Sequence, residues 1–222
     1  MTPDRKFEHS LVQLAQLPVK YVDGKRFYQA PTGEWYKSVT TILGEKLDKS
    51  GLNEWREKIG DTEADRISAI AARRGKAIHA MLEAYVKNDD RYAQGAMPVN
   101  IETFSRVKKV IDEHVGKIYG IECPLYSHLL KTAGSADLVA DWDDEPAIID
   151  LKGSTTDKKE EWIEGYFLQT AAYAVMFEER TGIRIDRTVV LVGSDTGLVQ
   201  TLARHRSASF RRLKEVFVDG PT

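Results

Sequence analysis

The stretch Ile148-Ile149-Asp150-Leu151-Lys152 ends an apolar run with an acid and an amine. Successive side chains of a β-strand point to opposite faces, so we expect Asp150 and Lys152 to project together while Leu151 points into the core. Burying charged groups without compensation is costly, and such a pair therefore needs a reason. A metal site is one reason, and a structural ion pair at a strand end is the other.

A second acid, Asp137, lies thirteen residues upstream in the segment Gly134-Ser135-Ala136-Asp137. The sequence between the two acids contains the turn signal Asp143-Asp144-Glu145-Pro146. A hairpin closed at this turn could bring Asp137 beside Asp150. Two carboxylates that converge from neighbouring strands make an oxygen-rich site for a hard divalent cation such as Mg²⁺.

The rest of the chain predicts an α/β fold in which a central mixed β-sheet is flanked by helices. Aromatic and β-branched residues around two turn signals indicate a small hairpin over 21–37. Apolar residues at three- and four-residue intervals indicate helices over about 62–86 and 101–118. A short helix or arm is expected over 1–17, strands over 121–130, 136–142, 147–151, 188–193 and 198–203, and helices over 158–180 and 207–218.

Composition limits the function classes. The chain has 222 residues, a formal net charge of -2 and a pI of about 6.2, which argues against a protein that coats duplex DNA through bulk positive charge. Its single cysteine, Cys123, excludes a disulfide framework and a four-cysteine zinc or iron-sulfur site. No signal-peptide pattern or membrane-spanning run is visible, so we expect a cytoplasmic protein with no membrane partner.

Four motifs carry a resemblance. The segment from Gly134 to Asp137, the triplet Asp150-Leu151-Lys152 and the run Gln169-Thr170-Ala171-Ala172-Tyr173 resemble the motif series of the RecB-like branch of the PD-(D/E)xK nucleases. The upstream segment from Arg74 to His79 resembles the arginine-glycine-spacer-histidine helix of that branch. The resemblance covers roughly residues 38–193. The segment from Ser38 to Leu43 is also similar to one in phage-encoded exonucleases related to the mitochondrial genome maintenance exonuclease.

The resemblance implies a restriction-endonuclease-like core and a set of site residues. It implies that His79, Asp137, Asp150 and the backbone carbonyl of Leu151 bind Mg²⁺ or Mn²⁺, and that Lys152 acts beside the metal. Together, Asp137, Asp150 and Lys152 are the expected catalytic residues. Other residues are expected to support the site or contact DNA: Glu122 reaching the metal through water, with Gln169, Tyr173, Arg74, Ser38 and Thr40.

Each of these assignments has a structural alternative. His79 could be a core histidine, Glu122 an ordinary strand glutamate, and Gln169 and Tyr173 a helix face that packs on the sheet. Ser38 and Thr40 could form a helix cap, although their hydroxyls suit phosphate contacts equally well. Basic and aromatic residues that could line a DNA groove are Arg73, Arg74, Lys76, Lys46, Lys49, Lys158, Lys159, Trp35, Tyr36 and Trp55.

The expected protein is a single nuclease domain over 1–222. Residues 1–60 would form the hairpin and arm, 61–205 the core with a helical insertion near 88–118, and 206–222 a C-terminal helix. No iron-sulfur cluster or motor domain is expected, so a recombination or replication protein could supply unwound DNA. The leading function is an exonuclease for single-stranded DNA in phage-type recombination, repair or degradation, in the host cytoplasm if phage-encoded. The alternatives are a structure- or duplex-specific endonuclease, an inactive DNA-binding protein of this fold, and a small phosphate esterase.

Overall fold

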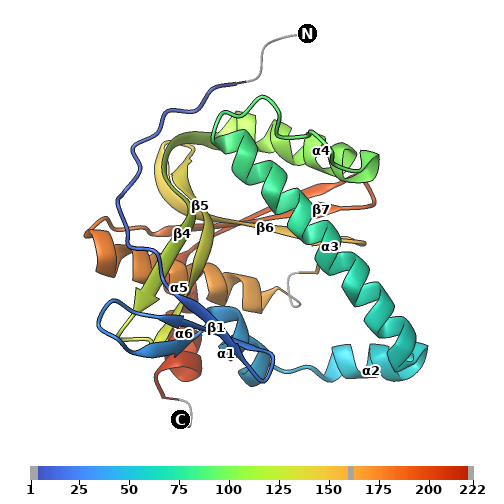
Figure 1. Cartoon of the computed structure of the whole chain (residues 1–222), viewed down its shortest axis with the longest axis horizontal. Coiled ribbons are helices and arrows are strands. Elements are labelled where there is room, and N and C mark those ends of the chain that lie inside the picture. Colours follow the sequence, from blue (N-terminus) through green and yellow to red (C-terminus); the bar gives the residue numbers. More distant parts are fainter. Residues whose placement is uncertain (1–4, 160–162, 220–222) are drawn as a thin grey trace.

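The computed structural model describes residues 5–159 and 163–219. At its centre is a five-stranded sheet in the order β4-β5-β6-β7-β8 (Figure 1). Only β6 and β7 pair in parallel, and the other neighbours are antiparallel, which confirms the mixed sheet. The strands are β4 (Val115–Ser127), β5 (Thr132–Trp142), β6 (Glu145–Ser154), β7 (Arg187–Ser194) and β8 (Val199–His205).

A separate three-stranded sheet precedes the helices. It consists of β1 (Val19–Val22), β2 (Lys25–Gln29) and β3 (Trp35–Lys37), all antiparallel. Its first turn uses Asp23 and Gly24, both at positive φ, as the turn signal predicted. The hairpin expected over 21–37 is therefore confirmed, with a third strand.

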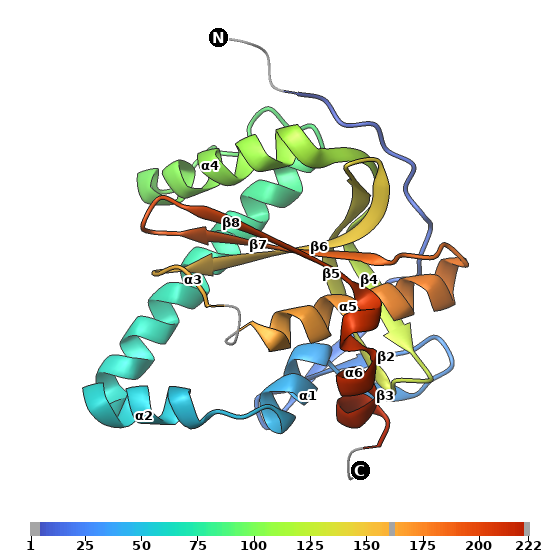
Figure 2. The same cartoon turned by 180° about the vertical axis from the view of Figure 1, so that it is seen from behind.

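Helices cover both faces of the central sheet (Figure 2). α3 (Asp61–Val86) and α4 (Pro98–His114) lie on one face, and α5 (Glu164–Thr181) lies on the other. α1 (Val39–Lys46), α2 (Ser50–Ile59) and the C-terminal α6 (Phe210–Phe217) complete the fold. None of the described helices has both the length and the apolarity that crossing a bilayer requires.

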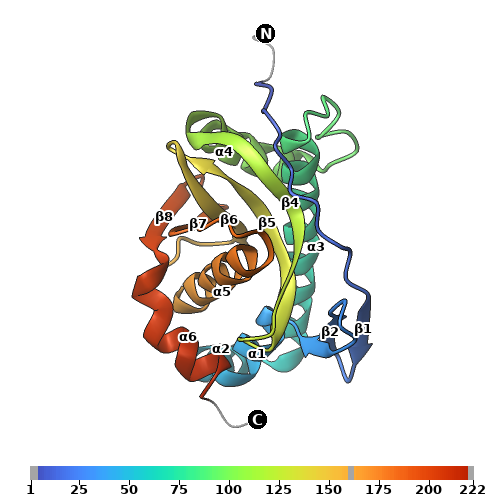
Figure 3. The same cartoon turned by 90° about the vertical axis from the view of Figure 1, so that its left-hand side faces the viewer.

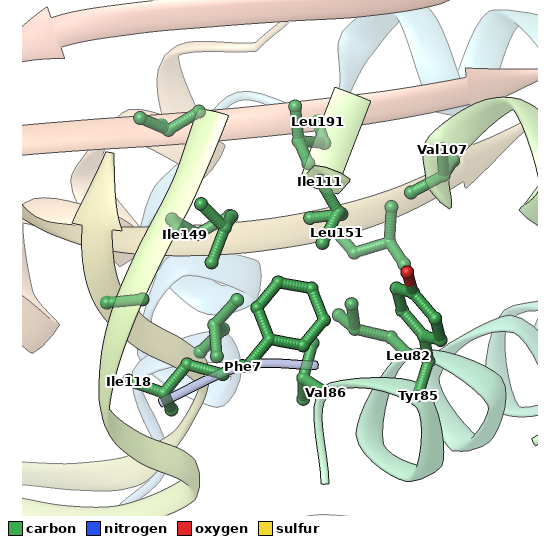
Figure 4. Close-up of a cluster of buried hydrophobic side chains, with 14 of the residues drawn as sticks. Phe7, Leu82, Tyr85, Val86, Val107, Ile111, Ile118, Ile149, Leu151 and Leu191 are labelled. Carbon is green, nitrogen blue, oxygen red and sulfur yellow. The ribbon is translucent and has the colours of Figure 1, made fainter. Parts of the chain in front are cut away.

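The side chains of β6 point alternately to the two faces of the sheet, and this decides which face carries Asp150 and Lys152. Ile149 and Leu151 point into the cluster beneath α3 and α4, shown in Figure 4. Ile148 belongs to the cluster beneath α5 instead. Leu151 is fully buried, as predicted, so Asp150 and Lys152 are left to face the α5 side.

The helix expected over 101–118 is too long at its C-terminal end. α4 ends at His114, and Val115 begins strand β4. Irregular pairing with β5 between Val115, Ile118 and Gly120 bulges the strand, and Val115 and Ile118 are both fully buried. Two buried residues three apart imitate helical spacing, which explains the error.

The helix expected from residue 158 begins later. α5 starts at Glu164. Before it, the backbone of Lys158 exchanges hydrogen bonds with the Gln200 side chain on β8, at 2.6 and 2.9 Å. This tertiary contact keeps Lys158 out of the helix, and residues 160–162 lie outside the described residues.

The N-terminal region forms an arm and not a helix. From Phe7 it runs along the edge of β4 (Figure 3), where Ser10 donates to the Ile118 carbonyl at 2.8 Å and Ile118 donates to the Glu8 carbonyl at 2.9 Å. The arm thus covers part of an exposed strand edge. Besides the arm and hairpin expected there, the first sixty residues contain α1 and α2.

Candidate active site

Strands β5 and β6 place two acids opposite each other. The last cross-strand pair is Leu138 with Ile149, and Asp137 and Asp150 are the next residues on the two strands. Asp137 Oδ2 also accepts a hydrogen bond from the Leu151 backbone amide at 2.9 Å. The carboxylate on β5 is thereby fixed to the strand that carries Asp150.

A third acid, Glu122, comes from β4. Ile121 pairs with Leu138, and the same register sets Glu122 across from Asp137. Glu122 has a φ of 44°, a left-handed conformation that costs a non-glycine residue about 1–2 kcal/mol. Its Oε2 accepts a hydrogen bond from the Ser135 hydroxyl at 3.2 Å. Burial, and next the charge of Asp137, raise the pKa of Glu122.

His79 reaches this row of acids from α3. Its Nδ1 lies 3.4 Å from Asp137 Oδ2. Burial acts to lower the pKa of His79, but the hydrogen bond and the charge of Asp137 outweigh it and raise the pKa above its ordinary value. Burial acts to raise the pKa of Asp137, but His79 and Lys152 hold that pKa below its ordinary value. Asp137 therefore remains a carboxylate, able to bind a cation.

Asp150 is fully buried between an amine and an amide. Its Oδ2 lies 2.6 Å from Lys152 Nζ, and its Oδ1 accepts from Gln169 Nε2 at 3.0 Å. Burial raises the pKa of Asp150 to about 6, although the Lys152 charge opposes this. Burial lowers the pKa of Lys152, but the charges of Asp150 and Asp137 outweigh it and raise that pKa. The lysine thus stays cationic inside the site.

Helix α5 supports Asp150 from the face of the sheet toward which Asp150 points. Gln169 and Tyr173 share one helical face, and Gln169 Nε2 lies 3.4 Å from the Tyr173 hydroxyl. Tyr173 is buried against Gly134 on β5, where a Cβ atom would come within 2.8 Å of the tyrosine ring. Glycine at position 134 is therefore required for α5 to approach β5 this closely.

The donor set fits a divalent cation. One ligand atom from each of His79, Glu122 and Asp137 lies within 4.8 Å of the other two. Asp150 Oδ2 is buried beside Lys152, yet no donor among the described residues is aligned to give it a hydrogen bond. Carboxylate oxygens with one imidazole suit Mg²⁺, and suit Mn²⁺ at least as well. This cluster is the candidate metal site.

The site opens into a cleft of about 470 Å³. Its floor includes His79, Glu122, Asp137 and Lys152. Arg26 and Thr40, from β2 and α1, form one wall. The other wall is formed by α3 through Gly75, Lys76, Ala80 and Glu83. Acids and cations thus both line the cleft: Glu83, Glu122 and Asp137, with Arg26, Lys76 and Lys152.

A family model described as the PD-(D/E)XK nuclease superfamily matches residues 25–219. This match spans most of the chain, including every residue of the candidate site. The chain belongs to the PD-(D/E)XK nuclease superfamily. Nucleases of this superfamily use divalent metals and act on DNA, and the acid and imidazole cluster is where such an ion would bind. The mixed sheet with flanking helices agrees with the restriction-endonuclease-like fold of the superfamily.

Comparison with solved structures gives more distant matches. One is a crystal structure of a "putative exonuclease" from Eubacterium rectale, which is 12% identical, covers 67% of this chain and 69% of its own, and has a TM-score of 0.39. No curated protein matches the chain.

Two motif residues of this nuclease lie apart from the cleft lining. The Arg74 guanidinium contacts Asp195 in the turn between β7 and β8 and donates to the Thr103 hydroxyl at 2.9 Å. Ser38 is buried and caps α1 by accepting from the Thr41 amide at 3.1 Å. Of the two hydroxyl residues predicted to contact DNA, only Thr40 lines the cleft.

Sequence reasoning missed several residues of the cleft. Glu83 lies four residues after His79, so helical spacing alone could have placed it on the same face. Tyr166, which does not line the cleft, was also missed; its ring centre lies 5.3 Å from Lys152 Nζ. Nothing in the sequence indicated Arg26, because its place beside β5 and the candidate site depends on how the small sheet packs against β5.

Proposed function

We propose that this protein is a divalent-metal-dependent DNA exonuclease that prefers single-stranded DNA with a free end. The observation that carries the proposal is the cluster of His79, Glu122 and Asp137 beside the buried Asp150–Lys152 pair, in an open cleft. We assign Asp137, Asp150 and Lys152 as catalytic. His79, Asp137, Asp150 and the Leu151 carbonyl are the proposed metal ligands, with Glu122 nearby.

Each proposed catalytic residue has a distinct task. A bound divalent ion supplies Lewis acidity toward the scissile phosphate and lowers the pKa of water. Lys152 places a fixed ammonium where it offsets negative charge that develops on the phosphate. Asp137 and Asp150 are held in position by the Leu151 amide and the Gln169 amide, so their oxygens need little reorganisation.

The size of the cleft favours a single strand. About 470 Å³ is the volume of a typical small-molecule site, which is enough for one or two nucleotides of a strand that enters it. Arg26 and Lys76 lie on opposite walls, where both can contact phosphates of one strand. A partner that unwinds DNA, or substrate that is already single-stranded, would supply such a strand.

The connection between the two walls favours a free end. Thr40 on α1 and Lys76 on α3 line opposite walls, and α2 joins these helices. Helix α2 contains no buried residue and packs chiefly on α3, apart from the sheet (Figures 1 and 2). A strand that passes beneath this connection is inserted most simply by its end, as in an exonuclease.

In this proposal the exonuclease acts in phage-type DNA metabolism. Its support is the similarity of the segment from Ser38 to Leu43 to phage-encoded exonucleases. We accordingly place the activity in DNA recombination, repair or degradation.

Digestion of end-labelled oligonucleotides tests the nuclease. Purified protein with Mg²⁺ or Mn²⁺ should shorten a single-stranded 40-mer, and Asp150→Ala or Lys152→Ala should slow it by about 1,000-fold or more. Asp90→Ala is the matched control, because it removes an acid whose side chain is 75% exposed. If both site variants cut as fast as the control, the proposed site is wrong.

Circular substrates separate the two nuclease modes. An exonuclease that needs a free end leaves circular single-stranded DNA and supercoiled plasmid intact, whereas an endonuclease opens them. Cleavage of circles at the rate of linear DNA would replace the exonuclease proposal with the endonuclease. Binding of oligonucleotide without any cleavage in either metal would favour an inactive DNA-binding protein.

A further inference from the structure

The small sheet of β1, β2 and β3 has two chemically different faces. Arg26 and Tyr28 alternate with Lys25 and Phe27 along β2, so the two pairs point to opposite faces. Tyr28 is buried with Ala133 of β5, which shows that its face is turned toward the central sheet. Arg26 shares that face and lines the active-site cleft.

Two lysines of the opposite face, Lys25 and Lys37, have an acid partner, but Arg26 does not. Lys25 and Lys37 both pair with Glu45, at 2.7 and 2.8 Å. Arg26 Nη2 instead lies 3.3 Å from the Thr40 hydroxyl, and its guanidinium lies 5.4 Å from the centre of the Tyr28 ring. Within residues 5–159 and 163–219, no acid comes within ion-pair distance of it. A guanidinium without an acid partner, in a cleft, is suited to a phosphate.

An aromatic ring stands next to this cation. Tyr21 on β1 is the direct cross-strand partner of Arg26, so their side chains share a face. Tyr21 is 69% exposed, the largest exposed fraction among the large apolar side chains of the described residues. Burial raises the pKa of Tyr28, Arg26 acts to lower it, and Tyr21 and Glu122 each act to raise it. An exposed ring beside a cation matches how proteins hold single-stranded nucleic acid.

We propose that Arg26 and Tyr21 form a nucleotide-binding subsite, in which Arg26 contacts the phosphate next to the scissile one and Tyr21 stacks on the base of that nucleotide. The subsite rests on the proposed nuclease function and specifies how one wall of the cleft holds the strand. Thr40 adds a hydroxyl beside Arg26. Lys76, on the facing wall, would contact the strand on the other side of the cut.

Binding without cleavage tests the phosphate contact. We would titrate a fluorescent single-stranded 12-mer with protein in EDTA at several salt concentrations and measure anisotropy. Arg26→Gln should weaken binding by about five- to tenfold and reduce the slope of log K against log salt by about 0.7, the value for one phosphate contact on a single strand. Lys20→Gln is the matched control, because it removes one charge from the same sheet on the opposite face, where Lys20 Nζ lies 4.0 Å from the Trp35 ring centre.

Abasic oligonucleotides test the stacking contact. Tyr21→Ala should weaken binding roughly tenfold while Tyr21→Phe leaves it unchanged, because the ring supplies the stacking energy. A short duplex at the 5′ or 3′ end of the 12-mer would make the protein bind it in one register. In a series of such substrates, each with one base removed, the loss of affinity caused by Tyr21→Ala should disappear at a single abasic position. That position identifies the nucleotide in the subsite.

Two outcomes would overturn the subsite. One is that Arg26→Gln changes the salt slope no more than Lys20→Gln does. The other is a Tyr21→Ala penalty that persists at every abasic position or is shared by Tyr21→Phe. If the parent enzyme is active, either result rules out the proposed subsite and does not contradict the proposed nuclease function. An inactive parent enzyme that still binds the 12-mer through Arg26 would remove the nuclease alone.

Discussion

Asp137 accepts a hydrogen bond from the backbone amide of Leu151, 2.9 Å away, across the pair of strands that carries the candidate active site. A carboxylate on β5 is thus oriented by the strand that holds Asp150 and Lys152. The bond uses one oxygen of Asp137, which also lies 3.4 Å from His79. This arrangement orients the acid before any cation binds.

Removing the Asp137 carboxylate should separate metal binding from folding. In Asp137→Asn the amide can still accept from Leu151, but it gives a cation a weaker ligand and no charge. We expect the increase in Tm caused by 5–10 mM Mn²⁺ in the parent protein to be lost, and cleavage to fall by about 1,000-fold. Differential scanning fluorimetry with and without metal measures the first effect. A parent-like Tm increase in the variant would contradict the assigned ligand.

Gln169 should act through Asp150. Gln169→Leu removes the donor 3.0 Å from Asp150 Oδ1 and leaves that buried oxygen without its partner. Loss of a group that orients a metal ligand typically lowers metal affinity or activity by about 10- to 100-fold. We therefore expect kcat to fall by that factor, with a smaller change in KM. Metal titrations of the cleavage rate should show a reduced metal affinity. Gln94→Leu, at an exposed position, is the control and should behave like the parent.

Metal binding should weaken in mild acid. The pKa of Asp150 is raised to about 6 by burial, so below that pH the group becomes a neutral acid that a cation must deprotonate. The metal-induced increase in Tm should therefore be large at pH 8 and small at pH 5.

The stability of the metal-free protein should depend on pH in the opposite direction. The folded pKa of Asp150 exceeds the unfolded value near 3.8, so this group contributes stability at low pH that is lost as the pH rises through about 6. Asp150→Asn should abolish both trends, and their persistence in that variant would assign them to another group.

Gly134 should not tolerate a side chain. In Gly134→Ala the new Cβ atom would come within 2.8 Å of the Tyr173 ring, which is buried and cannot retreat easily. Overpacking of this kind costs about 1–3 kcal/mol of unfolding free energy. Gly153→Ala is the matched control, because its Cβ atom would meet only Ile78 at 3.9 Å. Urea unfolding of the two variants measures the difference, and equal stabilities would show that α5 can move away from β5.

Cys123 should be unreactive in the folded protein. It is the single cysteine of the chain, it is 3% exposed, and burial raises the pKa of its thiol to about 12. The thiolate is the reactive form, so a disulfide reagent at pH 8 should modify the native protein slowly and the urea-unfolded protein at once. Fast native modification would mean that β4 opens locally.

Some of the active site could be predicted from local sequence. The alternation around Leu151 gave the shared face of Asp150 and Lys152, because a strand has a fixed two-residue period. The four-residue spacing of Gln169 and Tyr173 gave a shared helical face for the same kind of reason. These geometries depend only on residues close in the chain.

Other features depend on packing between residues far apart in the chain, and for these the local sequence pattern was insufficient or misleading. The end of α4 was misplaced because a β-bulge buries Val115 and Ile118 at helix-like spacing. The contact of Arg74 with Asp195 joins residues of α3 and the β7–β8 turn that no local rule relates.

The amino-acid sequence by itself determined that β6 would present an acid and an amine on one face, that α3 would carry His79, and that the hairpin would turn at Asp23. Backbone periodicity and turn chemistry are set by neighbouring residues, and so they can be read without a structure. Only the tertiary structure decided that Glu122 lies across from Asp137 and that Arg26 faces the cleft. Strand register and sheet packing depend on the burial of many distant side chains at once, and no single segment encodes them.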